Sequence, residues 1–180
     1  GNFLSNNIHG FPLRQGYGCE IKPRFRASDK LSFFCSFDYG FDPLNAGFAS
    51  FDSLGNPVFG ARELHTYVGT LTAKYIFKND LSLTVNARHY WNTGKYLKYY
   101  DLLDNGRLSE NITYPGNNDF SYNAFNVDAV FSWQFSPGSV ISVVYKNAIE
   151  KDEQIIPNSY ADNFSRTFQF PQANSTVLPN

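Results

Sequence analysis

Residues 125–135 alternate between apolar and polar side chains, and this alternation constrains the fold more than any other feature of the chain. The apolar positions are Phe125, Val127, Ala129, Phe131, Trp133 and Phe135, and the positions between them are Asn126, Asp128, Val130, Ser132 and Gln134. Successive side chains of a strand point to opposite faces, so a period of two indicates a β-strand with one apolar face and one wetter face.

A tight turn follows this strand. Residues 136–138 (SPG) suit a turn because proline presets φ and glycine adopts positive φ freely. Alternation resumes in residues 139–146, and we expect a hairpin that places Trp133 opposite Ile141 and Asp128 opposite Lys146. The acid and the base then face each other on the polar face, which favours this register.

Two earlier segments repeat the pattern, giving three hairpins over residues 17–148. Their short turns are at 28–30 and 78–80, whereas the connections 42–62, 96–123 and 147–173 are long and polar. The first connection contains a turn at residues 54–57 (LGNP) and could form a small secondary hairpin that stands off the main sheet. Residues 1–16 are expected to form a loop. Residues 149–173 are expected to be a polar loop with a short helix, since Tyr160, Phe164 and Phe168 are spaced by four. Residues 174–180 resemble the truncated start of a last strand.

The two faces of these strands differ in chemistry. One face carries charged residues that would line the lumen of a barrel: Glu20, Lys22, Arg24, Arg26, Asp38, Lys74, Arg88, Asp128 and Lys146. The other face is apolar, and its aromatic residues near the strand ends would form interfacial girdles: Tyr17, Phe25, Tyr39, Tyr67, Phe77, Trp91, Trp133 and Phe135. The charged residues could draw anions or acidic sugars, or could simply neutralise one another.

In an up-and-down meander, all short turns fall at one end and all long loops at the other. This asymmetry is typical of outer-membrane barrels. The expected fold is therefore an all-β, antiparallel up-and-down meander of long hairpins, a fragment of a transmembrane β-barrel. A soluble sandwich has the same alternation with the apolar face turned into a core. Six strands are few for a closed membrane barrel, and the absent Met and the end at Asn180 favour a fragment.

The sequence contains few motifs that indicate a disulfide, a metal site or another ligand. Cys19 and Cys35 would lie four residues out of step on the first hairpin, so we expect free thiols rather than a disulfide. His9, His65 and His89 are isolated, so no metal and no cofactor are expected. The net charge of −1 gives no argument for nucleic acid.

The connection 96–123 offers two further features. Asp101, Asp104 and Glu110 could supply a catalytic pair of carboxylates, although loop acids are usually only solvated. Several tyrosines could stack on sugar rings, or could equally be part of an aromatic belt: Tyr96, Tyr99, Tyr100, Tyr114 and Tyr122.

Several short motifs also point to a family. They are RFRASDKL (24–31), DYGFDPLN (38–45), YIFKNDLSL (75–83), FSWQFSPGSVISVVYKN (131–147) and NFSRTFQFPQANS (163–175). With them the chain resembles the C-terminal barrel region of the DUF5916 family, which are outer-membrane proteins of the Bacteroidota type, often preceded by a carbohydrate-binding family 9-like domain. That N-terminal domain and the closing aromatic-ended strand are not found in this sequence.

We therefore expect a non-enzymatic scaffold, anchor or solute passage in the outer membrane of a Gram-negative bacterium, linked to glycan or nutrient handling. Its expected partners are outer-membrane lipid, the rest of its own barrel with its N-terminal domain, and glycans. The alternatives are an outer-membrane hydrolase acting on carbohydrate through external loops, and a soluble β-domain that binds a small ligand.

Overall fold

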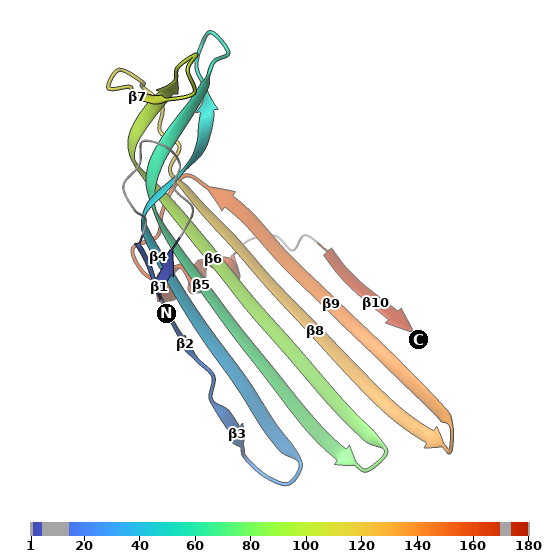
Figure 1. The fold of residues 1–180 in the computed structure, drawn as a ribbon. Coiled ribbons are helices and arrows are strands. Elements are labelled where there is room, and N and C mark those ends of the chain that lie inside the picture. Colours follow the sequence, from blue (N-terminus) through green and yellow to red (C-terminus); the bar gives the residue numbers. More distant parts are fainter. Residues whose placement is uncertain (1, 5–14, 170–173, 180) are drawn as a thin grey trace.

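The computed structural model describes residues 2–4, 15–169 and 174–179, and within them the chain forms one antiparallel sheet with a short helix (Figure 1). The strands are β1 (Asn2–Leu4), β2 (Gln15–Ile21), β3 (Arg24–Arg26), β4 (Leu31–Phe51), β5 (Pro57–Lys78), β6 (Leu81–Leu102), β7 (Leu108–Glu110), β8 (Phe120–Ser136), β9 (Ser139–Glu153) and β10 (Asn174–Pro179). The helix is α1 (Tyr160–Thr167). None of the helical residues in this part of the chain forms a segment long and apolar enough to cross a membrane.

The strand order follows the sequence. The path is β1-β2-β4-β5-β6-β8-β9-β10, with β3 paired to β4 and β7 paired to β6. Pro23 lies between β2 and β3, where a missing backbone N–H does least harm. The all-β antiparallel meander expected from the sequence is confirmed.

The hairpin registers also agree with the sequence. Trp133 pairs with Ile141 and Asp128 with Lys146, as expected. Cys19 pairs with Tyr39 rather than Cys35, and both cysteines are free. Gly138 has a φ of 78°, a conformation that glycine adopts without strain, so the last hairpin turns tightly.

The central strands are much longer than the alternation indicates. β4 has 21 residues, and β5 and β6 have 22 each, which is about 70 Å at ~3.3 Å per residue. The expected hairpin turn within residues 42–62 is confirmed, but the segment is not a connection that stands off the main sheet, because β4 and β5 themselves continue to a short turn at residues 52–56. Bulges between Asp42 and Asn45 and between Phe48 and Ser50 interrupt the period of two, which hides the strand in the sequence.

The other two long connections also contain regular structure. Residues 96–123 include the end of β6, the short strand β7 and the start of β8. Residues 147–173 include the end of β9 and the helix α1, which holds Tyr160 and Phe164. As Figure 1 shows, the turns β3–β4, β5–β6 and β8–β9 lie at one end of the sheet, here called the turn end, and β7 lies at the opposite, long-loop end.

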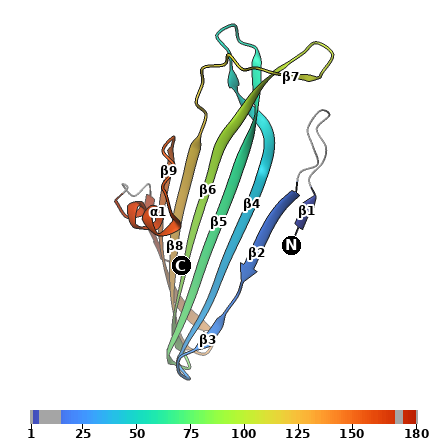
Figure 2. The same ribbon diagram turned by 90° about the vertical axis from the view of Figure 1, so that its left-hand side faces the viewer.

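The faces separate as the alternation requires. Cross-strand pairing places Phe37, Gly69, His89, Phe125 and Ile149 in one row on the face here called the apolar face. The opposite, charged face has Glu20 beside Asp38 and Asp128 beside Lys146. Helix α1 packs on the apolar face and lies to one side of the sheet in Figure 2.

The hydrophobic core of the described part is small. Its buried apolar residues are Val58, Ala61, Trp91 and Ile149. Many large apolar side chains of the apolar face are instead exposed, including Phe25 (62%), Trp133 (43%) and Ile141 (42%). Contiguous exposed apolar surface of this kind is unusual for a soluble monomer and marks a surface that contacts something else.

Candidate functional site

Helix α1 is short and amphipathic, and residues at both of its ends stabilise it. The Ser159 side chain accepts a hydrogen bond from the backbone N–H of Asp162 (3.1 Å), which satisfies one of the free donors at the helix start. Asp162 in the first turn and Arg166 in the last turn both suit the helix dipole. Tyr160 and Phe164 face the sheet from consecutive turns, with their ring centroids 6.3 Å apart.

A buried polar network fastens α1 to the sheet. The Tyr160 hydroxyl lies 2.8 Å from Nδ1 of His89, and Nε2 of His89 lies 3.0 Å from Oδ1 of Asn123. The amide nitrogen of Asn123 donates to Asn163 Oδ1 (3.1 Å) and to Thr167 Oγ1 (2.8 Å). Four of these residues are almost completely buried: His89, Asn123, Asn163 and Thr167.

The partners fit a neutral imidazole, which is the form that burial favours. The Asn123 oxygen can only accept, so Nε2 of His89 carries the proton and Nδ1 accepts from the Tyr160 hydroxyl. The Thr167 hydroxyl donates to the backbone oxygen of Asn163 (3.0 Å). The imidazole is therefore neutral and fully engaged, which makes it a structural histidine rather than a free base.

An aromatic cluster continues from the helix toward β4. Tyr67 stacks on Trp91 with ring centroids 4.8 Å apart and also contacts Tyr39 (5.0 Å) and Tyr160 (5.6 Å). The Trp91 indole N–H donates to Ser121 Oγ at 3.0 Å. Three of the girdle candidates, Tyr39, Tyr67 and Trp91, thus lie together beside α1, and Trp91 is only 3% exposed. The other five are exposed: Tyr17, Phe25, Phe77, Trp133 and Phe135.

A groove opens beside the helix. It has a volume of about 320 Å³, and its lining includes Gly69, Leu71, Ala87, Phe125, Tyr160 and Phe164. The sheet supplies two small residues together with Leu71 and the Phe125 ring, and the helix supplies two further aromatic rings.

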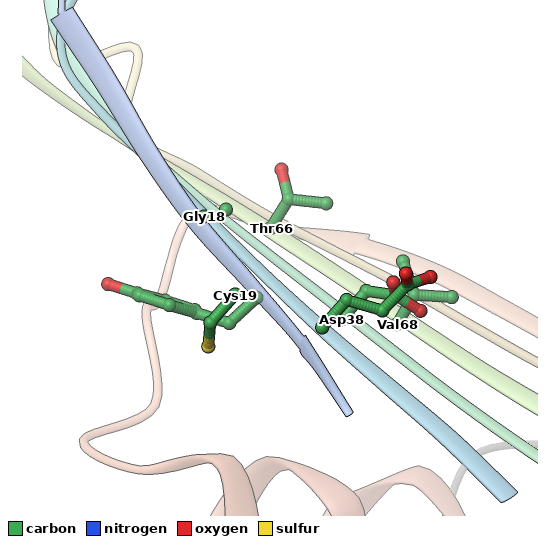
Figure 3. Close-up of a pocket in the computed structure, with 8 residues that line it drawn as sticks. Gly18, Cys19, Asp38, Thr66 and Val68 are labelled. Atoms are coloured by element: carbon green, nitrogen blue, oxygen red, sulfur yellow. The ribbon is translucent and has the colours of Figure 1, made fainter. Parts of the chain in front are cut away.

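The lumen candidates lie on the charged face, and three of them form a cluster near β2. Lys22 makes an ion pair with Glu20, which pairs with Asp38 across the β2–β4 ladder. An open pocket of about 480 Å³ adjoins this cluster. Figure 3 shows Asp38 beside Val68 in its lining, with the Cys19 side chain directed away from them.

Like charges directly opposite in a sheet repel, and the pKa values of the two carboxyls shift in opposite directions. The hydrogen bond from Lys22 lowers the pKa of Glu20. The hydrogen bond to Glu20 raises the pKa of Asp38. Asp38 is therefore the carboxyl that gains a proton first as the pH falls.

The remaining lumen candidates lie farther along the same face. The Arg24 guanidinium lies over the Phe34 ring (5.7 Å), and Arg26 pairs with Asp29 at 3.0 Å in the first turn. Lys74 is opposite Ser32 and Thr84, Arg88 is opposite Thr70 and Asn126, and Asp128 is opposite Asn86 and Lys146.

A second cluster, at the long-loop end of the charged face, was missed by the sequence analysis. The Arg62 guanidinium donates to Asn45 Oδ1 (3.0 Å) and to the Tyr96 hydroxyl (2.7 Å), and lies 5.4 Å from the Tyr96 and Phe120 ring centroids. An open cavity of about 480 Å³ adjoins it, also lined by Asp119, Asp152 and Glu153. Arg62 lies in a segment interpreted as a loop, and bulges at both strands removed the signal.

The loop acids proposed as a catalytic pair are engaged in other contacts. Both Asp101 carboxylate oxygens accept from the Asn111 amide (2.8 and 3.0 Å), and Glu110 makes an ion pair with Lys98 at 3.0 Å. Asp104 is exposed in the turn before β7. Asp101 pairs with Ser109 and Tyr100 with Glu110, so the side chains of Asp101 and Glu110 point to opposite faces and do not form a pair.

The histidines are likewise spread out. Nδ1 of His65 lies 3.0 Å from the Tyr39 hydroxyl, and burial lowers the pKa of His65. His9 lies outside the described residues. Within the residues whose placement is described, no three His, Cys, Asp or Glu side chains come close enough to hold a metal ion.

These features define a class: an antiparallel meander of long strands with one exposed apolar face and one charged face. The model of a protein family, described as a domain of unknown function (DUF5916), matches residues 6–178, so the chain belongs to that family. No curated protein matches the chain. No solved structure matches it either.

Proposed function

We propose that this chain forms part of the wall of a β-barrel in the outer membrane of a Gram-negative bacterium, where it acts as a scaffold, an anchor or a solute passage rather than as an enzyme. The observation that carries the proposal is the exposed apolar face. Its side chains meet neither a second sheet nor any helix other than α1 in the described part of the chain. Hydrocarbon is the environment in which such a face is stable.

The height of this face fits a membrane. The band runs from the row of Leu81, Trp133 and Ile141 at the turn end to the row of His89 and Phe125. It therefore covers nine residues of β6, and a membrane strand needs about 9–11 residues. Nine residues extend about 30 Å along the strand, and a tilt of about 40° reduces this to roughly 23 Å, near the ~25 Å apolar band of such barrels.

The chemistry changes above this band. Between the two rows, the strand positions of the apolar face hold no Asp, Glu, Lys or Arg. Directly above it come the polar and aromatic residues beside α1, such as Ser121 and Thr93. The long-loop halves of β4, β5 and β6 therefore project beyond the membrane, on the external side if the short turns are periplasmic.

The charged face supports a lumen. Arg88, Asp128 and Lys146 lie on this face at the depth of the apolar band, where only a water-filled or protein-filled interior would tolerate them. Solutes would pass through this lumen, and glycans would contact the long-loop end. The rest of the barrel would pair with the two ends of the strand order.

The two native cysteines provide a matched test. Both lie on the apolar face, but Cys35 lies inside the band, opposite Leu71, and Cys19 lies above it, opposite Tyr39. In intact outer membranes, we expect a water-soluble maleimide to label Cys19 in a Cys35→Ser variant. We expect little labelling of Cys35 in a Cys19→Ser variant until the membrane is dissolved in detergent and the protein is unfolded.

Fractionation provides the second readout. The full-length protein should sediment with outer membranes and require detergent for extraction. Rapid labelling of Cys35 in intact membranes, or a protein that stays monodisperse without detergent, would contradict the proposal.

A further inference from the structure

We propose that the groove beside α1 binds one acyl chain of a membrane phospholipid. The inference rests on the proposed membrane location and adds to it a specific lipid site. The groove is bounded by Gly69, Leu71 and Ala87 of the sheet and roofed by Tyr160 and Phe164 of the helix.

The shape of the groove follows from residue size. Gly69 and Ala87 lie on neighbouring strands in adjoining rows, so the sheet surface is low there. A Cβ added at Gly69 would lie 3.0 Å from the Tyr160 hydroxyl, which shows that the helix sits close above that position. Phe164 lies one turn further along the helix, with its ring 6.2 Å from that of Phe125. The result is a channel between small residues below and aromatic rings above.

The lining is mostly apolar. Its polar members are Ser36, Thr70, His89 and Tyr160, and both nitrogens of His89 and the Tyr160 hydroxyl already have partners. The one buried nitrogen of the helix network without a partner, Asn163 Nδ2, does not belong to the lining of the groove. A polar solute would find few groups there to replace its hydrogen bonds with water, whereas a hydrocarbon chain has no such hydrogen bonds to lose. The volume of about 320 Å³ is at the lower end of the range for small-molecule sites, ~300–1,000 Å³, which suits a single chain rather than a bulky ring system.

The position of the groove indicates the source of the chain. It adjoins the exposed apolar band, where Leu71 is 43% exposed, and α1 lies at the upper border of that band. A phospholipid in the surrounding leaflet could therefore insert one chain under the helix while its headgroup stays at the interface beside the exposed side of α1. The occupant is thus continuous with the proposed environment of the face.

The test compares two matched substitutions in the full-length protein purified in detergent. Ala87→Leu fills the groove. Ala129→Leu makes the same change on the neighbouring strand β8, two positions nearer the turn end, on the same face but outside the groove. After thorough washing, each protein is incubated with palmitoyl-oleoyl phosphatidylglycerol and examined by native mass spectrometry. We expect one retained lipid in the wild type and in Ala129→Leu, and at least about a fivefold lower occupancy in Ala87→Leu.

A second measurement needs no substitution. A phosphatidylcholine with a diazirine in one acyl chain should label the peptide that contains Phe164 in wild-type protein in bilayers, and excess unlabelled lipid should compete slowly. Equal lipid retention by both variants, or no labelling of that peptide, would show that the groove does not bind an acyl chain, while leaving the membrane proposal intact. A protein that needs no detergent would overturn both.

Discussion

The hydroxyl of Tyr160 lies 2.8 Å from Nδ1 of His89, a residue 71 positions earlier in the chain. This contact joins the only helix of the described residues to the middle of the longest strands. It lies at the border where the exposed apolar band ends and the long-loop half of the sheet begins.

Replacing Tyr160 with Phe tests how firmly the helix is held. The ring packing would persist, but Nδ1 of His89, a buried acceptor, would lose its donor. Leaving a buried polar group unsatisfied costs about 1–3 kcal/mol, and we expect this cost in the opening of α1. Hydrogen exchange of the amides of residues 160–167 should therefore become at least several-fold faster.

Ser165→Ala is the matched control on the same helix. Ser165 is exposed, and its hydroxyl bonds only to the backbone oxygen of Ala161 in the preceding turn. Its exchange should match that of the wild type. Unchanged exchange in Tyr160→Phe would show that ring packing alone holds the helix.

Much of the fold could be predicted because the alternation and the turn residues within each hairpin determine its register. The alternation around Trp133 and the Pro137–Gly138 turn fix which residues pair, and Trp133 lies opposite Ile141 as expected. The same reasoning correctly separated Cys19 from Cys35. Each of these inferences depends only on neighbours within one hairpin.

The long-loop end could not be predicted for the opposite reason. Bulges near Asn45 and Arg62 shift the side chains between faces, so the strand continues although its periodicity stops. The network of His89, Asn123 and Thr167 was also missed. It joins two strands to a helix that is far away in the sequence, and each residue alone looks like an ordinary polar position.

The Glu20–Asp38 pair should make stability depend on pH. The pKa of Asp38 is raised in the fold by its hydrogen bond to Glu20, so this contact contributes fully at low pH and is lost as the pH rises through that raised pKa. The pKa of Glu20 is lowered by Lys22, so its contribution is lost instead as the pH falls through the lowered value. Above the ordinary Asp pKa of 3.8 the Asp38 contribution therefore falls with rising pH, whereas the Glu20 contribution grows until the ordinary Glu pKa of 4.5 is passed.

Asp38→Asn keeps the shape and removes this titration. We expect the variant to gain stability relative to the wild type between pH 4 and pH 8, as measured by the urea midpoint in detergent. Ser32→Ala, on the same strand and the same face but without a titratable group, is the control and should show a difference independent of pH. A constant difference for Asp38→Asn as well would mean that the contact with Glu20 does not raise the pKa of Asp38 in the fold.

The cluster at the long-loop end should be sensitive to one glycine. A Cβ at Gly94 would overlap the ring of Phe120, which also contacts the Arg62 guanidinium. We expect Gly94→Ala to destabilise the fold by about 1–3 kcal/mol, the usual cost of overpacking. In contrast, a Cβ at Gly40 would meet only Thr66 Cβ at 3.8 Å, an ordinary contact. Gly40→Ala should therefore be close to neutral in the same unfolding measurement, and equal losses in the two variants would contradict this account.

The two tryptophans report on the two parts of the apolar face. Trp133 is 43% exposed at the turn end, whereas Trp91 is 3% exposed beside α1. In bilayers with brominated acyl chains, we expect strong quenching of Trp133 fluorescence in a Trp91→Phe variant, because its ring would touch lipid. Iodide in the water should quench it little. Trp91, observed in a Trp133→Phe variant, should be quenched weakly by both agents, because Tyr67 and Tyr160 cover it. Strong iodide quenching of Trp133 in intact bilayers would place the apolar face in water and remove the physical basis of the proposed function.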